Sequence, residues 1–214
     1  TYSCQEWGEM DPPAGNQVYP KLEVKGEIKF ESELSPDIVT LSSYPGGTNP
    51  TIVNDEFKGK VLQLAGGYAR YNNPLANVKL QKGASLTMWF KTSEDNLSGA
   101  IFSFSNEDNS EHLFFTPNAW LKYQGPDGTY EVNNPASTQT GAFTPNEWHY
   151  LALSIQTDGY FIYIDGEKKY EEKVEGFDFS KIVDAFFSLP YFYVGYGSST
   201  QPKTLWVDDI KVYR

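Results

Sequence analysis

Residues 146–155, NEWHYLALSI, and residues 159–170, GYFIYIDGEKKY, are two neighbouring runs joined by Gln-Thr-Asp. Both runs alternate large apolar residues with smaller or polar ones, which is the period-two pattern of a half-buried β-strand. The second run contains Asp165-Gly166, a dipeptide that favours the two-residue type I′ turn of a hairpin. The stretch therefore predicts consecutive antiparallel strands with a tight turn at each junction.

The composition of the whole chain favours the same class of structure. Among 214 residues, 39% are hydrophobic and 16% are aromatic, and 18 Gly and 13 Pro supply turns. No window shows the apolar period of a long helix, and strand-like runs recur about every 8–12 residues. We predict an all-β protein, either a sandwich or a jelly roll, with one short helix near residues 177–186.

The charge of the chain excludes one class of partner. Acidic residues number 28 against 17 basic ones, so the formal net charge is −11. An acidic surface without a local cluster of Lys and Arg repels phosphate backbones, which excludes nucleic acid. No apolar run approaches the roughly 18 residues of a membrane-spanning helix, so we predict membrane contact only through a lipid anchor.

The N-terminal segment differs from the rest of the chain. Residues 1–20 show no periodicity and are rich in Pro and Gly, which predicts a tether ahead of a single domain over residues 21–214. Cys4 is the single cysteine, so no intrachain disulfide can form. Residues 1–11, TYSCQEWGEMD, resemble the mature start of a bacterial lipoprotein, in which Cys4 would carry the lipid. That resemblance implies an extracytoplasmic, outer-membrane lipoprotein facing the cell surface or periplasm; the alternative is a thiol without a role.

Several motifs occur in an order that resembles a known family. The ordered motifs are GKVLQLAGGYARYNNP (59–74), SLTMWFKTS (85–93), GAIFSFSN (99–106), NEWHYLALSI (146–155), YFIYIDGE (160–167) and LWVDDIKVYR (205–214). Together they are similar to the laminin-G-like domains of the concanavalin A-like lectin/glucanase superfamily. The resemblance implies a two-sheet antiparallel jelly-roll sandwich, a fold shared by lectins, carbohydrate-binding modules, adhesion domains and some glycosidases.

The sequence offers little for catalysis. Enzymes of this superfamily usually carry a Glu-x-Asp-x-x-Glu pattern that pairs two carboxylates, and the chain lacks it. Glu31 and Glu33, on one face of an expected strand, are the best enzymatic candidates, although such a pair far more often belongs to a solvated outer face. His149 follows Trp148 where the family has a structural histidine, and no nucleophile stands beside a base. We predict no catalytic residue.

Aromatic residues beside amides predict a sugar-binding surface, because sugar C–H faces stack on rings and hydroxyls bind planar polar groups. The segment PNAWLKYQGPDGTY (117–130) supplies Trp120, Tyr123 and Tyr130. Two further segments add Tyr71 with Asn72, and Tyr196. The alternative is that most of these rings fill the core. The remaining strand tryptophans, Trp89, Trp148 and Trp206, are assigned to the core.

Calcium is a further prediction that follows from the resemblance. In many relatives a structural Ca²⁺ joins the first and last strand regions near a motif like VDDIKVY, which matches residues 207–213. The resemblance implies Asp208 as a ligand, with Asn54 or Asp55 as a partner. The alternative is that Asp208 bonds to the backbone.

These observations predict a non-catalytic, lectin-like carbohydrate-binding domain of a cell-surface lipoprotein that supports polysaccharide capture or degradation. The expected partner is a poly- or oligosaccharide, together with a glycoside hydrolase or a surface complex. The alternatives are a structural or adhesive domain that binds a protein, and a glycoside hydrolase.

Overall fold

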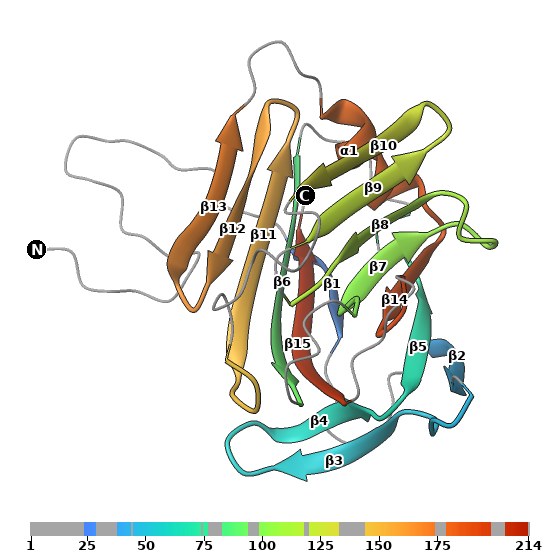
Figure 1. Cartoon of the computed structure of the whole chain (residues 1–214), viewed down its shortest axis with the longest axis vertical. Coiled ribbons are helices and arrows are strands. Elements are labelled where there is room, and N and C mark those ends of the chain that lie inside the picture. Colours follow the sequence, from blue (N-terminus) through green and yellow to red (C-terminus); the bar gives the residue numbers. More distant parts are fainter. Residues whose placement is uncertain are drawn as a thin grey trace, which may run out of the picture.

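The computed structural model describes residues 24–28, 38–43, 45–73, 75–76, 83–93, 99–117, 120–132, 144–173, 179–197 and 204–213. Its strands form two antiparallel sheets that share one core (Figure 1), which confirms the predicted jelly-roll sandwich. The first sheet has eight strands in the order β13-β12-β11-β6-β15-β4-β3, with β1 paired to β15. The second has seven strands in the order β10-β9-β8-β7-β14-β5-β2.

The bounds of the elements follow the predicted rhythm of short strands. The eight-stranded sheet comprises β13 (Glu167–Lys173), β12 (Gly159–Ile164), β11 (His149–Gln156), β6 (Gly83–Thr92), β15 (Leu205–Tyr213), β4 (Gly59–Leu64), β3 (Thr51–Asp55) and β1 (Val24–Ile28). The seven-stranded sheet comprises β10 (Gly128–Val132), β9 (Leu121–Gly125), β8 (His112–Phe115), β7 (Phe102–Ser105), β14 (Tyr191–Val194), β5 (Gly67–Asn72) and β2 (Ile38–Ser43). The helix α1 (Ser180–Ser188) falls where the short helix was predicted. In the described part of the chain, no helix has the length and apolar character needed to cross a membrane.

Residues 146–155 and 159–170, the two alternating runs, contribute β11, β12 and the first part of β13. Leu151 of β11 lies opposite Met88 of β6 on one side and opposite Ile164 of β12 on the other. Asp165 and Gly166 have φ values of +54° and +80°, the left-handed pair that a type I′ turn requires. The predicted succession of antiparallel strands is therefore confirmed.

The core lies between the sheets and is built from the inward-facing residues of both. On β6, Leu86, Met88 and Phe90 are all fully buried. Phe104 of β7 contacts Phe186 of α1, with ring centroids 4.8 Å apart, so the helix adds its apolar face to the same core. Each such side chain removed from water stabilises the fold by about 1.5–3 kcal/mol.

The assignment of Trp89, Trp148 and Trp206 to the core is wrong. All three side chains are half-buried, whereas the residues that follow them in the chain, Phe90, His149 and Val207, are buried. Successive side chains of a strand point to opposite faces, so the buried neighbours Phe90 and Leu205 direct Trp89 and Trp206 outward. The three indoles lie on the outer face of the eight-stranded sheet.

Candidate functional site

An exposed phenylalanine marks the end of the β3–β4 hairpin. Phe57 is 79% exposed, and no other large hydrophobic side chain in the described segments is classed as exposed. The turn is held by Asp55, whose Oδ1 accepts hydrogen bonds from the backbone N–H groups of Phe57 (2.9 Å) and Lys58 (3.1 Å). Gly59 follows with φ +70°, a conformation that other residues rarely adopt. The local sequence therefore places an aromatic ring in solvent at the tip of the hairpin.

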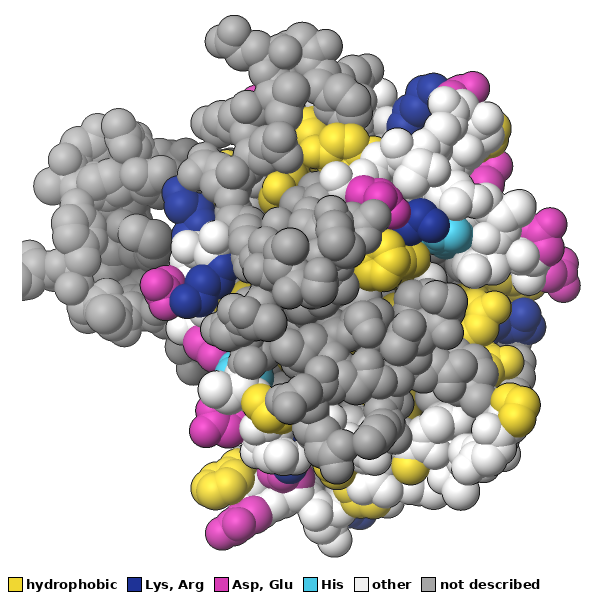
Figure 2. All heavy atoms as spheres, in the orientation of Figure 1, with side chains coloured by type: hydrophobic (Ala, Val, Ile, Leu, Met, Phe, Trp, Pro, Cys, Tyr) yellow, Lys and Arg dark blue, Asp and Glu magenta, His cyan; other side chains and the backbone are white. Residues whose placement is uncertain are grey.

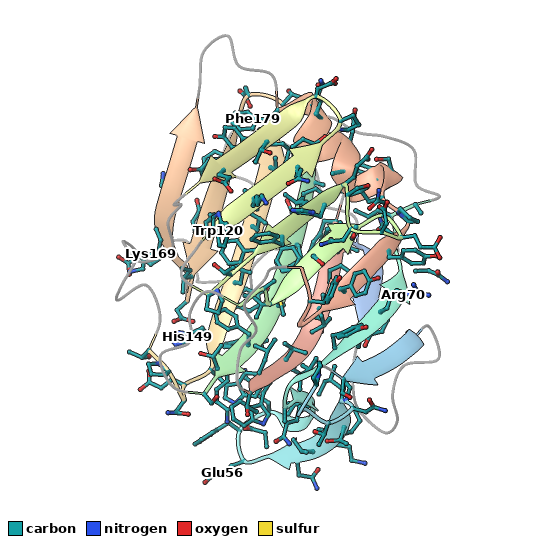
Figure 3. The ribbon with its side chains drawn as sticks, turned by 45° about the vertical axis from the view of Figure 1, so that its right-hand side comes forward. Glu56, Arg70, Trp120, His149, Lys169 and Phe179 are labelled. Atoms are coloured by element: carbon teal, nitrogen blue, oxygen red, sulfur yellow. The ribbon has the colours of Figure 1, made fainter. Side chains whose placement is uncertain are left out.

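Two adjoining hollows flank this tip, and together we call them the tryptophan cleft. The first, of about 350 Å³, is lined by Phe57, Lys58, Trp89, Lys91, Asn146, Glu147 and Trp148. The second, of about 340 Å³, is lined by Val53, Asn54, Asp55, Glu56, Phe57, Gln63, Lys91 and Trp206. Figure 3 labels Glu56 at the end of the β3–β4 hairpin, and Figure 2 shows hydrophobic and acidic side chains projecting at the same corner. Phe57 and Lys91 belong to both hollows and separate them.

Hydrogen bonds set the orientation of two of the indole rings. The Nε1–H of Trp148 donates to both carboxylate oxygens of Asp55, at 3.0 and 2.9 Å. The Nε1–H of Trp206 donates to Oε1 of Gln63 at 2.9 Å. Both indole N–H groups are therefore satisfied inside the protein.

Lys91 lies between the indole rings of Trp148 and Trp206. Its Nζ lies 5.3 Å from the ring centroid of Trp148, 4.7 Å from that of Trp206 and 3.5 Å from Oδ2 of Asp55. An ammonium within about 6 Å of an aromatic face is attracted by the ring quadrupole. Because the ion pair adds to this attraction, Lys91 is held at the centre of the cleft.

The carboxyl group of Asp55 carries a shifted pKa. Burial by itself would raise the pKa of Asp55, but the hydrogen bonds from Trp148 and from the N–H groups of Phe57 and Lys58 outweigh it. The charge of Lys91 acts in the same direction, so the pKa of Asp55 lies below its ordinary value. Asp55 is therefore a stable anion that accepts hydrogen bonds within the protein.

The segment that carries Trp148 is attached to the neighbouring hairpin through His149. The Nδ1 of His149 lies 2.7 Å from Oδ2 of Asp165, and its Nε2 lies 2.8 Å from the carbonyl oxygen of Thr144. Asp165 also accepts a hydrogen bond from the backbone N–H of Tyr150 at 2.8 Å. This network joins residues 144–150 to the β12–β13 turn and so fixes one wall of the cleft (Figure 3). The structural role that the sequence assigned to His149 agrees with this geometry.

The predicted sugar-binding residues do not converge on one surface. Tyr123 and Tyr130 lie opposite each other on β9 and β10 and lean against the core. Trp120 contacts Phe114 edge to face, with ring centroids 4.8 Å apart, on the other side of the same sheet. Tyr71 is 1% exposed and its ring lies in the core, so this residue cannot offer a face to a sugar.

The two other predicted positions lie elsewhere in the seven-stranded sheet. Asn72 is exposed at the end of β5. Tyr196 belongs to a cluster of tyrosines and contacts Tyr68 at 5.0 Å and Tyr193 at 4.8 Å between centroids. The participation of Trp120, Tyr123, Tyr130, Asn72 and Tyr196 in ligand binding stays a prediction. Cys4, Glu31 and Glu33 lie outside the described residues.

Tyr123 and Tyr130 do border a smaller hollow, which we call the tyrosine pocket. It has about 190 Å³ and is lined by Tyr123, Asp127, Gly128, Thr129, Tyr130, Lys181 and Ile182. Lys181 of α1 forms an ion pair with Asp127 across its mouth. Burial, followed by the charge of Glu111, raises the pKa of the Tyr123 hydroxyl.

The predicted calcium ligands lie on the same side of the molecule as the tryptophan cleft. Asp55 is already bonded by Trp148, Lys91 and two backbone N–H groups, and Asp208 pairs in register with Trp89. Within the described segments, no group of three or more His, Cys, Asp or Glu side chains could hold a metal ion. A calcium site that uses Asp208 stays a prediction.

The sequence contained a signal for the outward direction of two tryptophans of the cleft. In SLTMWFKTS, Trp89 has the same parity as Thr87 and Lys91, and opposite parity to the apolar Met88 and Phe90. Trp206 likewise has the parity of Asp208 rather than that of its apolar neighbours. A large ring that shares a strand face with Lys or Asp is outward-facing. Phe57 offered no such signal, because its exposure depends on the turn.

Comparison with protein families gives one match. The family model described as "Concanavalin A-like lectin/glucanases superfamily" matches residues 65–213. A search of curated proteins finds no match.

Several solved structures share the fold. Domain 4 of AbnA, a GH43 extracellular arabinanase from Geobacillus stearothermophilus solved with arabinotriose, aligns with a TM-score of 0.65 at 14% identity, covering 90% of this chain and 93% of that domain. The carbohydrate esterase vb_24B_21 of the Shiga toxin-encoding bacteriophage phi24B aligns with a TM-score of 0.51 at 18% identity, over 90% and 98% of the two chains. The binding domain of botulinum neurotoxin DC, in complex with rat synaptotagmin II, aligns with a TM-score of 0.50 at 13% identity, over 89% and 48%. At these identities the similarity shows a shared fold alone.

Proposed function

The chain belongs to the concanavalin A-like lectin/glucanase superfamily, and on this premise we propose that it is a non-catalytic domain that binds a neutral glycan. The observation that carries the proposal is the tryptophan cleft, where Trp89, Trp148 and Trp206 surround the exposed Phe57. Sugar rings present flat C–H faces, and oriented indoles on a sheet surface are suited to stack on them.

The hydrogen bonds of the indoles favour this use. Because Asp55 and Gln63 already accept the N–H groups of Trp148 and Trp206, a ligand that covers these rings leaves no donor unsatisfied. One ring stacked on a sugar contributes about 1–2 kcal/mol. After the cost of association, two or three rings support a dissociation constant in the micromolar to millimolar range.

The charges around the cleft favour a neutral sugar over a uronic acid. Carboxylates outnumber lysines among its lining residues by three to two, and the formal charge of the chain is −11. The exposed side chains of Asn146 and Glu147 stand at the rim, where they can accept or donate hydrogen bonds to hydroxyl groups. An anionic polysaccharide would meet net repulsion there.

The bonding of Asp55 supports a binding role rather than catalysis. A glycosidase needs two carboxyl groups poised as acid and nucleophile, whereas Asp55 is committed to its hydrogen bonds with Trp148 and the hairpin turn, and Glu147 accepts a hydrogen bond from the Thr144 hydroxyl. The arabinotriose complex of the arabinanase domain shows that a domain of this fold binds an oligosaccharide. It supports the proposal without identifying the sugar.

We further propose the setting in which this domain works. The resemblance of residues 1–11 to a lipoprotein start supports attachment through Cys4 to the outer membrane, where the domain would assist polysaccharide capture or degradation. A glycoside hydrolase or surface complex would be its partner. A structural Ca²⁺ ligated by Asp208 remains part of this proposal.

Affinity electrophoresis in gels that contain single polysaccharides tests the proposed function. Wild type should be retarded by at least one neutral polysaccharide, arabinan included, and not by polygalacturonate; Trp148→Ala should be retarded much less, as expected for binding weakened about 5- to 30-fold. Trp120→Ala, which removes a tryptophan outside the cleft, is the matched control and should be retarded like wild type. Repeating the gels with EDTA tests the calcium site.

Each failure has a separate meaning. If folded wild-type protein is retarded in none of the gels, glycan binding is wrong and a protein partner becomes the leading function. The synaptotagmin complex of the toxin domain shows a member of this fold solved with a protein, and the exposed ring of Phe57 would suit such a contact.

A further inference from the structure

Lys58 covers one of the indole rings of the tryptophan cleft. Its Nζ lies 3.1 Å from the ring centroid of Trp89. Trp89 also contacts Tyr150, with ring centroids 5.0 Å apart at an interplanar angle of 49°. Because Lys58 lines the same hollow as Trp89, its ammonium group occupies a ring surface that would otherwise face the ligand.

The two lysines of the cleft are held very differently. Lys91 forms an ion pair with Asp55 and lies between two indoles. Lys58 has no ion pair within 4.0 Å among the side chains that the structure describes, although Asp208, Asp55 and Asp209 attract it from farther away. Burial lowers the pKa of Lys58 despite this attraction. If the side chain of Lys58 rotates into solvent, the cation–π contact with Trp89 is therefore the main interaction that is lost.

The position of Lys58 in the hairpin makes such a movement simple. Lys58 follows the exposed Phe57 at the tip and precedes Gly59. Its backbone N–H donates a hydrogen bond to Asp55, and this bond does not depend on where the side chain lies. Rotation of its side-chain torsions alone would move the ammonium into solvent. No change in the sheet is required, because the strands on either side keep their pairing.

From this geometry we propose that Lys58 is a specificity-determining residue, which fills the place of a sugar ring on Trp89 and must be displaced when a glycan stacks there. This inference rests on the proposed function of the cleft. It implies that Trp148 and Trp206, beside the fixed ammonium of Lys91, contact a ligand without any movement of Lys58, and that Trp89 becomes a third platform only for sugars that displace the Lys58 ammonium. A small sugar would bind without Trp89, and a longer oligosaccharide would recruit it.

The covering of Trp89 can be tested without any glycan. Brief oxidation with N-bromosuccinimide, followed by peptide mass spectrometry, measures the reactivity of each tryptophan in wild type, Lys58→Ala and Lys58→Met. We expect Trp89 to react more slowly than Trp148 in wild type and to become several-fold more reactive in both variants. Lys60→Ala removes an exposed charge from the same hairpin and should leave Trp89 protected. An unchanged reactivity of Trp89 in the Lys58 variants would overturn the inference.

Binding measurements test the displacement. With a glycan that retards wild type, Lys58→Ala and Lys58→Met should bind about 2- to 30-fold more tightly, since the cation–π contact no longer competes. Lys58→Arg keeps a competing cation and should bind like wild type, as should Lys60→Ala. Acetylation of Lys58 should also become faster when the glycan is added, whereas that of Lys60 should not change.

The two tests separate this inference from the proposed function. Weaker binding by Lys58→Ala and Lys58→Met would show that Lys58 contacts the sugar, and would overturn the inference while leaving glycan binding intact. Faster oxidation of Trp89 in these variants, without glycan binding by any protein, would reject the proposed function while confirming that Lys58 covers the ring.

Discussion

The tryptophan cleft and the tyrosine pocket contain similar residues arranged for different purposes. In the cleft, Trp148 and Trp206 bond to side chains through their N–H groups, and the hollows beside them measure about 350 and 340 Å³. In the tyrosine pocket, of about 190 Å³, Tyr130 stacks edge to face on Phe179, and both tyrosines lean on the core. Rings that pack on the core stabilise the fold, whereas half-buried rings on the outer face of a sheet remain available to a ligand.

The direction in which an aromatic side chain points, more than its chemical type, therefore determines whether it stabilises the core or remains available to a ligand. Tyr123 points to the inner face of its sheet with Leu121, and Trp89 to the outer face of its sheet with Lys91. The charged pairs differ in the same sense: Asp55 is only 8% exposed beside Lys91, whereas Asp127 is 72% exposed beside Lys181. Variants in the tryptophan cleft and in the tyrosine pocket should therefore differ in stability and in glycan binding.

The largest effect should come from Asp55→Ala, which removes the acceptor for Trp148 and for the hairpin turn. We expect the free energy of unfolding to fall by about 1–3 kcal/mol, because the indole N–H is left without its partner. Glycan binding should be lost as well. Urea denaturation and affinity electrophoresis measure the two effects. Asp127→Ala, in the tyrosine pocket, is the matched control and should change stability by less than about 0.5 kcal/mol; equal losses in the two variants would contradict the contrast.

Substitution of the rings themselves should separate binding from stability. Trp148→Ala and Trp206→Ala should each weaken glycan binding by about 5- to 30-fold, which corresponds to one stacked ring. Tyr123→Ala should lower the free energy of unfolding by about 1–2 kcal/mol and leave the dissociation constant unchanged. Isothermal titration calorimetry and urea denaturation of the same preparations give both values. Weaker binding by Tyr123→Ala would restore the site predicted from the sequence.

Acid should act on the cleft through Asp55. Its folded-state pKa lies below the ordinary value, so its ionised form stabilises the fold above about pH 4, and this stabilisation is lost as pH falls through the folded pKa. Asp55→Asn lacks this titration. The difference in unfolding free energy between wild type and Asp55→Asn should be constant from pH 7 to about pH 5 and should shrink below about pH 4. A difference that stays constant down to pH 3 would contradict the lowered pKa of Asp55, because it would mean that ionisation of this carboxyl group does not stabilise the fold.

The smallest effect should come from the ion pair at the tyrosine pocket. Lys181 and Asp127 are 56% and 72% exposed, and such pairs contribute about 0–1 kcal/mol. Lys181→Ala should therefore change neither the midpoint of urea denaturation nor glycan binding by a measurable amount. A clear loss of binding in this variant would place the ligand at the tyrosine pocket instead of the cleft.

Much of the fold could be predicted because it depends on local pattern. The alternation in residues 146–170 and the Asp165-Gly166 turn specify three adjacent strands, and the ordered motifs identify the superfamily. These features are set by residues that are neighbours along the chain or by the period of the strand.

The sequence by itself therefore determined the all-β class, the strand rhythm, the acidic charge and the hairpin turns, since each follows from nearby residues. Parity along the strands indicates that Trp89 and Trp206 face outward, but which of the outward rings lie together depends on the tertiary structure. It brought Asp55 to Trp148, 93 positions away, and Gln63 to Trp206, 143 positions away, and so built the tryptophan cleft. No local pattern could show this, because the cleft depends on which strands lie side by side in the sheet. The pairing of distant strands is settled by burial of the whole core rather than by any one segment.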